Sequence, residues 1–531
     1  MAAQNVEIPH LRSIEGSKQL IVHGRPFLVL GAELQNSSLT SAEHMDTVWQ
    51  NLVDAHVNTV LGCVTWEIIE PVEGQFDFKE LDKIILGARK HGLHVVLLWF
   101  GSYKNGISTY VPGWVKTNPN RFPRMKLRKA GGVLQTTEIL SVLHEEAPKA
   151  DAKAFARLMR HLREFDQDYS TVVMVQVENE SGLLGDSRDG SAAAEERFSQ
   201  PVPNDLLTFL AGSWDYLHQD LKRNLVHFKA HRSPRGSWAE VFGKGPHNHE
   251  LFMAYHYALY VNQVAAAGRE EYPLPLYCNA WQNYAGEDSD NDFPVVVGGG
   301  GLPGDYPSGG CITNVLDIWQ HFAPSVDFLT PDIYLNDYES LCSKYRHRGQ
   351  PLFIPEQRRD EYGARRSWTA IASYQAIGVS PFALDTLKPE ENPYIRHFAL
   401  LESVSQIVLE AQQRPGSSVG FFFDELKADG TDPSKPVTRQ YGGYEITIER
   451  AFVLGKPGPG ILRFEEKVVT NKETGELKTR RVLNGDETRS GQFAIMPNED
   501  PDYGGFPIAI TILAKTMIAE LQFYSLDECE V

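Results

Sequence analysis

Residues 172–180 read VVMVQVENE, an apolar run of strand length that stops at an amide and two carboxylates. Strands that are buried on both faces read this way in parallel sheets, and the carboxyl ends of such strands are where these folds place their functional groups. A second run, PLFIP at residues 351–355, ends at Glu356. Two glutamates at the tips of two buried strands predict a pair of carboxylates that faces one pocket.

Short apolar runs alternate with amphipathic stretches along most of the chain. The predicted strands are 27–33, 57–66, 93–101, 172–180, 276–281, 328–334, 352–356 and 378–385. The predicted helices lie near 41–55, 78–91, 151–167, 248–267, 314–322, 367–377 and 395–412. Strands that alternate with helices form a parallel sheet, and eight such strands close into a (β/α)8 TIM barrel, the α/β fold that we expect. A doubly wound open sheet is the alternative, but it normally has a glycine-rich turn after its first strand, where this chain has ELQN at residues 33–36.

The pattern of predicted elements changes after residue 412. Two long insertions precede the change, at 104–150 and 282–313, and both are expected to shape a binding site at the carboxyl end of the barrel. Beyond the change, turn signals separate strand-like pieces, at 444–451, 460–466, 492–496 and 508–513. We therefore predict a catalytic barrel with its lead-in over 1–412 and a β-sandwich-like accessory domain over 413–531.

The composition restricts the partners and cofactors of the chain. It has 531 residues and a formal net charge of -18, which disfavours nucleic acid and anionic membranes as partners. Its five cysteines are scattered without C-x-x-C spacing, and no H-E-x-x-H motif occurs. The glycine-rich run at 299–304 is followed by a segment that cannot begin the helix that a nucleotide site requires. We expect no metal and no cofactor.

The start of the chain lacks a basic region followed by an apolar one, and no apolar run approaches the length that spans a bilayer. These features predict a soluble, cytoplasmic protein, with a secreted mature form as the alternative.

A pair of carboxyl groups at strand ends is typical of a glycoside hydrolase. Cleavage of a glycosidic bond needs a protonated carboxyl that gives its proton to the leaving oxygen and a carboxylate that faces the anomeric carbon. Glu180 and Glu356 are the candidates, and the amide of Asn179 could bind the sugar's 2-hydroxyl. For a single strand-end glutamate, a surface salt bridge is the competing interpretation. Arg358 and Arg359 follow Glu356 and could hold it ionised or, alternatively, face solvent.

Two aromatic residues at strand ends are further candidates for the site. Tyr334 ends the sixth predicted strand and could donate its hydroxyl hydrogen to the nucleophile. Trp281 ends the fifth, and a flat indole suits the apolar face of a sugar. Core packing is the alternative for both side chains.

The run QVENE at 176–180 resembles the acid/base signature of glycoside hydrolase family 35, the β-galactosidase family whose catalytic glutamates end barrel strands four and seven. The stretch 58–78 is similar to the second-strand segment of that family and also resembles family 42. Residues 99–114 and 376–382 look like the third- and eighth-strand segments of a family 35 branch with a β-rich carboxyl-terminal domain.

The resemblance implies that Glu180 is the acid/base, that Glu356 is the nucleophile and that Asn179 binds a sugar hydroxyl. The chain departs from better-known members where they contact the sugar's 3- and 4-hydroxyls, and this puts galactose specificity in doubt. Glu67 and Asn105 are the candidate replacements for those polar contacts, with a structural role as the alternative.

Together these features predict a retaining exo-β-glycosidase, in first place a β-galactosidase that removes terminal β-linked galactose from oligosaccharides by double displacement. The enzymatic alternatives are a β-glucosidase or a transglycosylase of the same fold. A non-catalytic carbohydrate-binding barrel is the alternative of another class. The expected partner is a carbohydrate substrate, with no nucleic acid, no membrane and a possible homodimer.

Overall fold

The structure is a computed structural model that describes a defined set of residues: 7–228, 235–284, 300–416, 418–422, 431, 436–441, 444–453, 456–466, 482–483 and 508–510. It divides into two compact units. The first comprises residues up to 13, 17–357 and 377–387, and the second comprises 14–16, 358–376 and the chain from 388 onward. The division predicted at 412/413 from the sequence texture stays a prediction.

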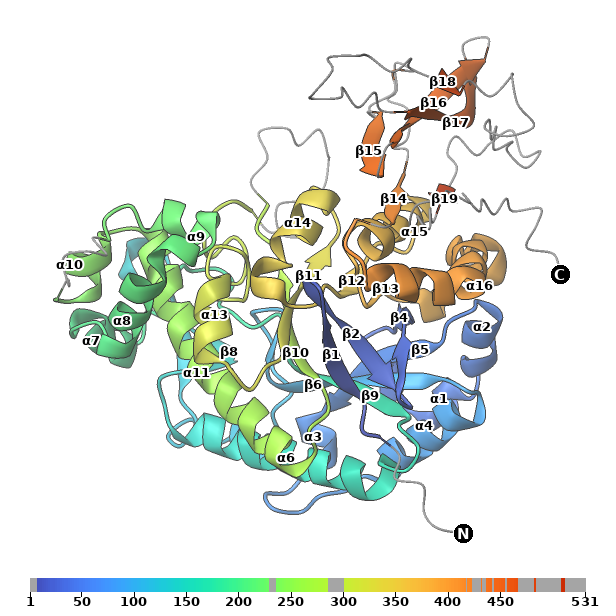
Figure 1. Cartoon of the computed structure of the whole chain (residues 1–531). Coiled ribbons are helices and arrows are strands. Elements are labelled where there is room, and N and C mark those ends of the chain that lie inside the picture. Colours follow the sequence, from blue (N-terminus) through green and yellow to red (C-terminus); the bar gives the residue numbers. More distant parts are fainter. Residues whose placement is uncertain are drawn as a thin grey trace. The chain divides into compact units, whose positions relative to one another are not determined.

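Eight strands of the first unit close into a barrel, in the order β10-β11-β12-β13-β4-β5-β6-β9 (Figure 1). The strands are β4 (Val29–Glu33), β5 (Thr59–Thr65), β6 (His94–Lys104), β9 (Val172–Asn179), β10 (Leu276–Trp281), β11 (Phe328–Ile333), β12 (Ile354–Gln357) and β13 (Gly378–Pro381). Their pairings are parallel. The predicted TIM barrel is thus confirmed, and the open sheet is excluded because the strand order closes on itself.

The barrel interior is filled by apolar side chains from every side. Leu61, Val96, Met174, Tyr277 and Phe328 belong to one buried cluster. All eight residues of β9 are buried, because helices cover the outer face of the strand while the cluster fills the inner one. This double burial explains why the run at 172–175 is continuous in apolar residues rather than alternating.

Helices follow the strands and form the outer layer of the first unit. They are α1 (Ala42–Met45), α2 (Trp49–Asp54), α3 (Trp66–Ile69), α4 (Lys79–Lys90), α5 (Gly113–Lys116), α6 (Glu146–Asp166), α7 (Ala192–Ser199), α8 (Asn204–Ser213), α9 (Gln219–Asn224), α10 (Trp238–Phe242), α11 (Pro246–Glu271), α13 (Leu316–Phe322) and α14 (Tyr338–Lys344). The predicted helix at 41–55 is divided between α1 and α2. The long helices α6 and α11 pack against each other outside the barrel.

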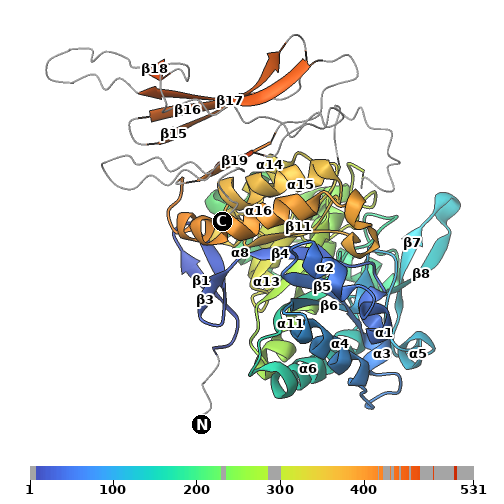
Figure 2. The same ribbon diagram turned by 90° about the vertical axis from the view of Figure 1, so that its right-hand side faces the viewer.

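A hairpin occupies part of the insertion that the sequence predicted as a loop. Its strands are β7 (Arg124–Arg128) and β8 (Leu134–Leu140), and Figure 2 shows the pair standing out from the barrel. Gly131 and Gly132 have φ angles of 75° and 78°, which only glycine adopts readily, and they let the chain turn back. A three-stranded sheet of β1 (His10–Ile14), β2 (Ser17–Val22) and β3 (Arg25–Phe27) precedes the barrel in the sequence.

The described residues of the second unit include two α-helices and the carboxyl-terminal strands. The helices are α15 (Glu361–Trp368) and α16 (Tyr394–Gln412). The helix predicted at 367–377 was placed too late: the Asp360 side chain accepts a hydrogen bond from the Gly363 amide and so begins α15 before residue 367. A π-helical turn (Thr369–Ser373) then ends this helical segment.

The carboxyl-terminal strands are β14 (Val419–Phe421), β15 (Val437–Tyr441), β16 (Tyr444–Val453), β17 (Lys456–Glu466), β18 (Val482–Leu483) and β19 (Ile508–Ile510). Strands β15 to β18 form one antiparallel sheet, and β14 pairs with β19. The predicted strands at 444–451 and 460–466 are confirmed, and the one at 492–496 lies outside the described residues. Among the described helices, none combines the length and apolar character that crossing a bilayer requires.

Candidate active site

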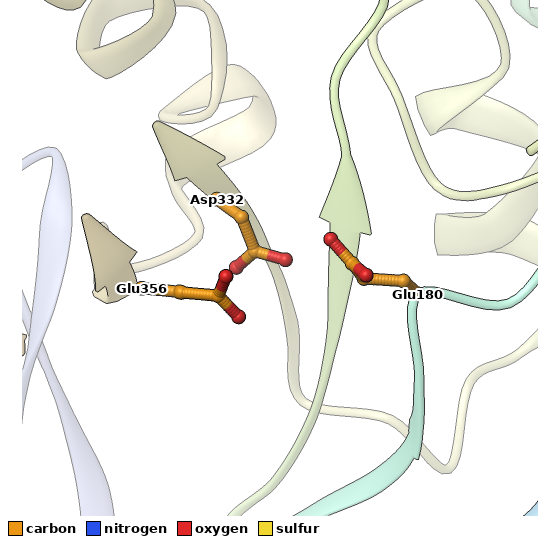
Figure 3. Close-up of side chains that lie close together, drawn as sticks. All are labelled: Glu180, Asp332 and Glu356. Atoms are coloured by element: carbon orange, nitrogen blue, oxygen red, sulfur yellow. The ribbon is translucent and has the colours of Figure 1, made fainter. Parts of the chain in front are cut away.

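Three carboxylates meet at the carboxyl end of the barrel. Glu180 follows β9, Asp332 lies in β11 and Glu356 lies in β12, and one oxygen of each lies within 4.8 Å of the others. Figure 3 shows the three side chains pointing toward one another from separate strands. Asp332 and Glu356 are register partners on neighbouring strands, so the sheet itself places them side by side. This is the end at which barrels of this kind carry their chemistry.

Glu180 is held by contacts to both its backbone and its side chain. Its amide donates a hydrogen bond to Asn279 Oδ1 at 2.9 Å, and its carboxylate accepts one from Asn105 Nδ2. The side chain is 5% exposed. Burial, with the charge of Glu356 as the second cause, raises the pKa of Glu180 to about 7. A carboxyl with such a pKa still carries its proton near neutral pH, as a general acid must.

Glu356 is held in place by a tyrosine. The Tyr334 hydroxyl donates a hydrogen bond to Glu356 Oε1 at 2.5 Å. Burial raises the pKa of Glu356, whereas the positive charge of Lys104 and the bond from Tyr334 act in the opposite direction. Both opposing interactions stabilise the ionised form that a nucleophile needs. Arg358, which could have supplied this charge according to the sequence, forms an ion pair with Asp360.

Asp332 completes the cluster on the side of β10. Its Oδ2 accepts a hydrogen bond from Asn279 Nδ2 at 2.8 Å, while its buried Oδ1 has no hydrogen-bond partner in the structure. Burial and the charges of Glu356 and Glu180 raise the pKa of Asp332 well above its usual value. The three carboxylates are also the residues that could hold a hard cation, which requires them deprotonated. Their raised pKa values favour proton chemistry instead.

Lys104 and Asn179 are register partners at the ends of β6 and β9. The Lys104 ammonium donates a hydrogen bond to Asn179 Oδ1 at 2.9 Å, whereas Asn179 Nδ2 is buried without a partner in the structure. Lys104 is 4% exposed. Its contact with Asn179 was not predicted from the sequence, although a lysine at the end of a buried strand is itself a signal.

Glu33 is a fourth buried carboxylate at this end of the barrel, and it too was missed. Val29 belongs to the apolar cluster inside the barrel, and strand alternation places Glu33, four residues later, on the same side. Burial, followed by the charge of Glu356, raises the pKa of Glu33 well above its usual value. The stretch VLGAE at 29–33 repeats the pattern of an apolar run that ends in a carboxylate, and this signal could have found it.

The remaining predicted site residues lie in different parts of the structure. Asn105 lies beside Glu180, as its hydrogen bond to that carboxylate shows. Trp281 ends β10 and is the register partner of Asp332. Glu67 forms an ion pair with Lys116 at 2.6 Å, and its side chain is 37% exposed. Among the described residues, no hydrogen bond joins Glu67 to the three carboxylates.

A second carboxylate cluster joins β9 to β6 and α6. Glu178 accepts hydrogen bonds from the amides of Ser102, at 3.2 Å, and Tyr103, at 2.7 Å. Asp151 of α6 accepts hydrogen bonds from Trp99 Nε1 at 2.9 Å and from Ser102 Oγ at 2.5 Å. We call Glu178 and Asp151 with these donors the sealed cluster, and Glu180, Asp332 and Glu356 the mouth cluster.

Comparisons with known proteins agree in part with the sequence-based resemblance. Residues 37–218, about a third of the chain, match the profile of glycoside hydrolase family 42, described as β-galactosidase. Residues 454–495 match a family described as a domain of unknown function. No curated protein sequence matches the chain. The comparisons do not support the narrower resemblance to family 35.

Several solved structures are similar to this chain at low identity. The β-amylase catalytic domain of Paenibacillus polymyxa is 13% identical with a TM-score of 0.48, over 70% of this chain and 96% of that one. The β-galactosidase of Halorubrum lacusprofundi is 15% identical with a TM-score of 0.46, over 74% and 59%. That of Bacillus circulans sp. alkalophilus is 13% identical with a TM-score of 0.46, over 72% and 57%. The chain thus spans under two thirds of the length of these β-galactosidases.

Proposed function

We propose that this protein is a retaining exo-β-glycosidase, in first place a β-galactosidase. The observation that carries the proposal is the convergence of Glu180 and Glu356 on one point, with a carboxylate oxygen of each within 4.8 Å of the other. Carboxyl groups about 5–5.5 Å apart let one of them attack the sugar directly, whereas an inverting enzyme keeps about 6.5–9.5 Å between them for a water molecule.

The two glutamates divide the reaction between them. In the first step the Glu356 carboxylate forms a bond to the anomeric carbon while the glycosidic bond breaks, and the leaving oxygen takes the proton of Glu180. In the second step the Glu180 carboxylate removes a proton from water, whose oxygen attacks the anomeric carbon and releases Glu356. Glu180 thereby regains its proton, and the configuration at the anomeric carbon is retained because it inverts twice.

Galactose is the proposed sugar because of the match of 37–218 to a β-galactosidase family and the resemblance of the stretch at 176–180. Assignment to family 35 rather than family 42 rests on that stretch and on the segments at 99–114 and 376–382. A β-glucosidase or a transglycosylase would use the same carboxylates. The homodimer, the cytoplasmic location and the domain boundary at 412/413 stay predictions.

Three measurements on the purified protein test the proposal. A panel of 4-nitrophenyl β-glycosides should show fastest release from the galactoside, and faster release from the glucoside would replace the proposed sugar. Proton NMR of the first product should show β-galactose, since an α-anomer would contradict double displacement. A 2-deoxy-2-fluoro-galactoside with a good leaving group should label Glu356, as peptide mass spectrometry would reveal. Binding of sugars without any turnover would support the non-catalytic barrel instead.

A further inference from the structure

Lys104 and Asn105, at the end of β6, form hydrogen bonds with Asn179 and Glu180, at the end of β9. Lys104 bonds to the side chain of Asn179, and the next residue, Asn105, bonds to the side chain of Glu180. A tight turn stabilises this arrangement, because the Lys104 amide donates a hydrogen bond to Ser108 O at 3.0 Å and its carbonyl accepts one back at 3.0 Å. The lysine is thus fixed next to the mouth cluster by backbone bonds.

The chemistry of the two groups decides how the amide of Asn179 is oriented. An ammonium group has only donors, so it must face the carbonyl oxygen of the amide rather than its NH2 group. The observed bond, from Lys104 Nζ to Asn179 Oδ1, obeys this rule. The NH2 group is therefore turned away from the lysine, and it is buried without a partner in the structure. A buried donor without a partner costs free energy unless a ligand satisfies it.

Lys104 is also a local positive charge among several acids. Its ammonium lies 4.8 Å from the centre of the Phe100 ring, and no ion pair among the described residues includes it. Its charge lowers the pKa values of the surrounding acids against the effect of burial. The titratable groups on which its charge acts are Glu33 of β4, Cys63 of β5, Glu180 after β9 and Glu356 of β12. Glu356 in turn interacts with Asp332 of β11 and with Tyr334, which follows β11.

We propose that Lys104 is a positioning residue, which fixes the amide of Asn179 so that its NH2 group donates a hydrogen bond to the 2-hydroxyl of the sugar. This inference rests on the proposed glycosidase function. Contacts to the 2-hydroxyl strengthen in the transition state of glycoside cleavage. Lys104 therefore acts on the rate through Asn179, without touching the substrate.

The test compares a galactoside with its 2-deoxy analogue, both as 4-nitrophenyl β-glycosides. Lys104→Met should lower kcat/KM for the galactoside by about 10- to 100-fold, the effect of one hydrogen bond in which a charged group takes part. For the 2-deoxy substrate, which lacks the contact, the loss should be much smaller. Lys116→Met, which removes an exposed lysine that pairs with Glu67, is the matched control and should change neither value. An equal loss on both substrates would overturn the inference.

A double-mutant cycle shows whether Lys104 acts through Asn179. Asn179→Asp keeps an acceptor for Lys104 but lacks the NH2 group. It should therefore lose the preference for substrates with a 2-hydroxyl to the same degree as Lys104→Met. Adding Lys104→Met to it should then remove no further preference, because the two residues form one unit. If the double variant lost more of this preference than Asn179→Asp alone, the inference would be contradicted. This variant also decides the case if Lys104→Met does not fold: an Asn179→Asp enzyme that keeps its full preference refutes the proposed contact.

The pH profile provides a readout that a purely structural lysine would not move. Because the charge of Lys104 lowers the pKa of Glu356, its removal should shift the acid limb of kcat/KM toward higher pH, while Lys104→Arg should leave the limb in place. An unmoved limb in a folded Lys104→Met enzyme would count against the inference. A wild-type protein that cleaves no β-glycoside would overturn the proposed function itself, an outcome distinct from all of these.

Discussion

The mouth cluster and the sealed cluster contain the same kind of residue, and both include a glutamate from the end of β9. Glu180 and Glu178 are both buried, two residues apart, and burial raises the pKa of both. They differ in their partners. Each oxygen of Glu178 meets a backbone amide, whereas the mouth cluster leaves the Oδ1 of Asp332 and the neighbouring Asn179 Nδ2 without a partner in the structure.

Under the proposed function, this difference is what separates a catalytic carboxylate from a structural one. Burial and a raised pKa are common to both clusters, so neither property identifies a site. Buried polar groups in folded proteins are normally hydrogen-bonded, and exceptions call for an explanation. Unpaired donors and acceptors next to closely spaced acids are what a substrate with many hydroxyls would satisfy. The two clusters can be separated by experiment.

The largest expected effect concerns the nucleophile of the mouth cluster. Glu356→Gln should lower kcat by about 10⁴-fold or more, since the amide cannot form the glycosyl-enzyme. Thermal unfolding should change little, because the amide can still accept the hydrogen bond from Tyr334. Steady-state kinetics and a melting curve would check both statements. A variant that kept most of its activity would end the assignment of the mouth cluster.

The next effect depends on the leaving group. Glu180→Gln should slow cleavage of glycosides with poor leaving groups by about 10²- to 10⁴-fold, the usual range for loss of a general acid. A dinitrophenyl galactoside needs little protonation, so its first step should be much less affected. A series of aryl galactosides of graded phenol pKa would measure this dependence. A uniform loss along the series would show that Glu180 is not the acid.

The sealed cluster should respond in stability rather than in chemistry. Asp151→Ala leaves the hydrogen-bond donors of Trp99 and Ser102 buried without an acceptor, which should cost about 3 kcal/mol of unfolding free energy. Urea denaturation would measure this cost, with kcat per folded molecule expected to stay near that of the wild type. Lost activity at unchanged stability would assign the sealed cluster to the active site instead.

A smaller effect is expected in the pH profile. The pKa of Glu180 is about 7, so kcat/KM should fall as the pH rises through about 7 and the acid loses its proton. The hydrogen bond from Asn105 lowers this pKa, so Asn105→Ala should move the alkaline limb to higher pH. Initial rates across a buffer series would locate the limb. A shift in the opposite direction would show that Asn105 does not stabilise the ionised form.

The smallest effect is expected at Glu67, outside both clusters. Its ion pair with Lys116 joins two partly exposed side chains, and such pairs contribute about 0–1 kcal/mol. Glu67→Gln should therefore leave both the unfolding free energy and kcat/KM for the galactoside nearly unchanged. A marked rise in KM would instead return Glu67 to the substrate-binding residues that the sequence suggested.

The sequence predicted the barrel because doubly buried strands leave continuous apolar runs, as in 172–175. The same runs located Glu180 and Glu356, because their last residues lie at one end of the sheet. What escaped prediction depends on local geometry. A polar residue at a strand tip, such as Lys104 or Glu33, gives no indication of which group it will face. The hairpin around Gly131 had a turn signal, but its first strand, 124–128, is rich in charged residues, and the segment read as a loop.

The backbone conformation at the end of β9 restricts which substitutions this protein can accept under selection. Glu178 and Glu180 have φ angles of 62° and 44°, a left-handed conformation that side chains other than glycine rarely adopt. The Glu178 carboxylate lies in the sealed cluster and the Glu180 carboxylate lies in the mouth cluster, with only Asn179 between the two residues in the sequence. A change at Glu178 is therefore expected to cost stability, and a change at Asn179 or Glu180 is expected to cost turnover. Laboratory evolution toward heat resistance should find its gains elsewhere and leave this tripeptide untouched.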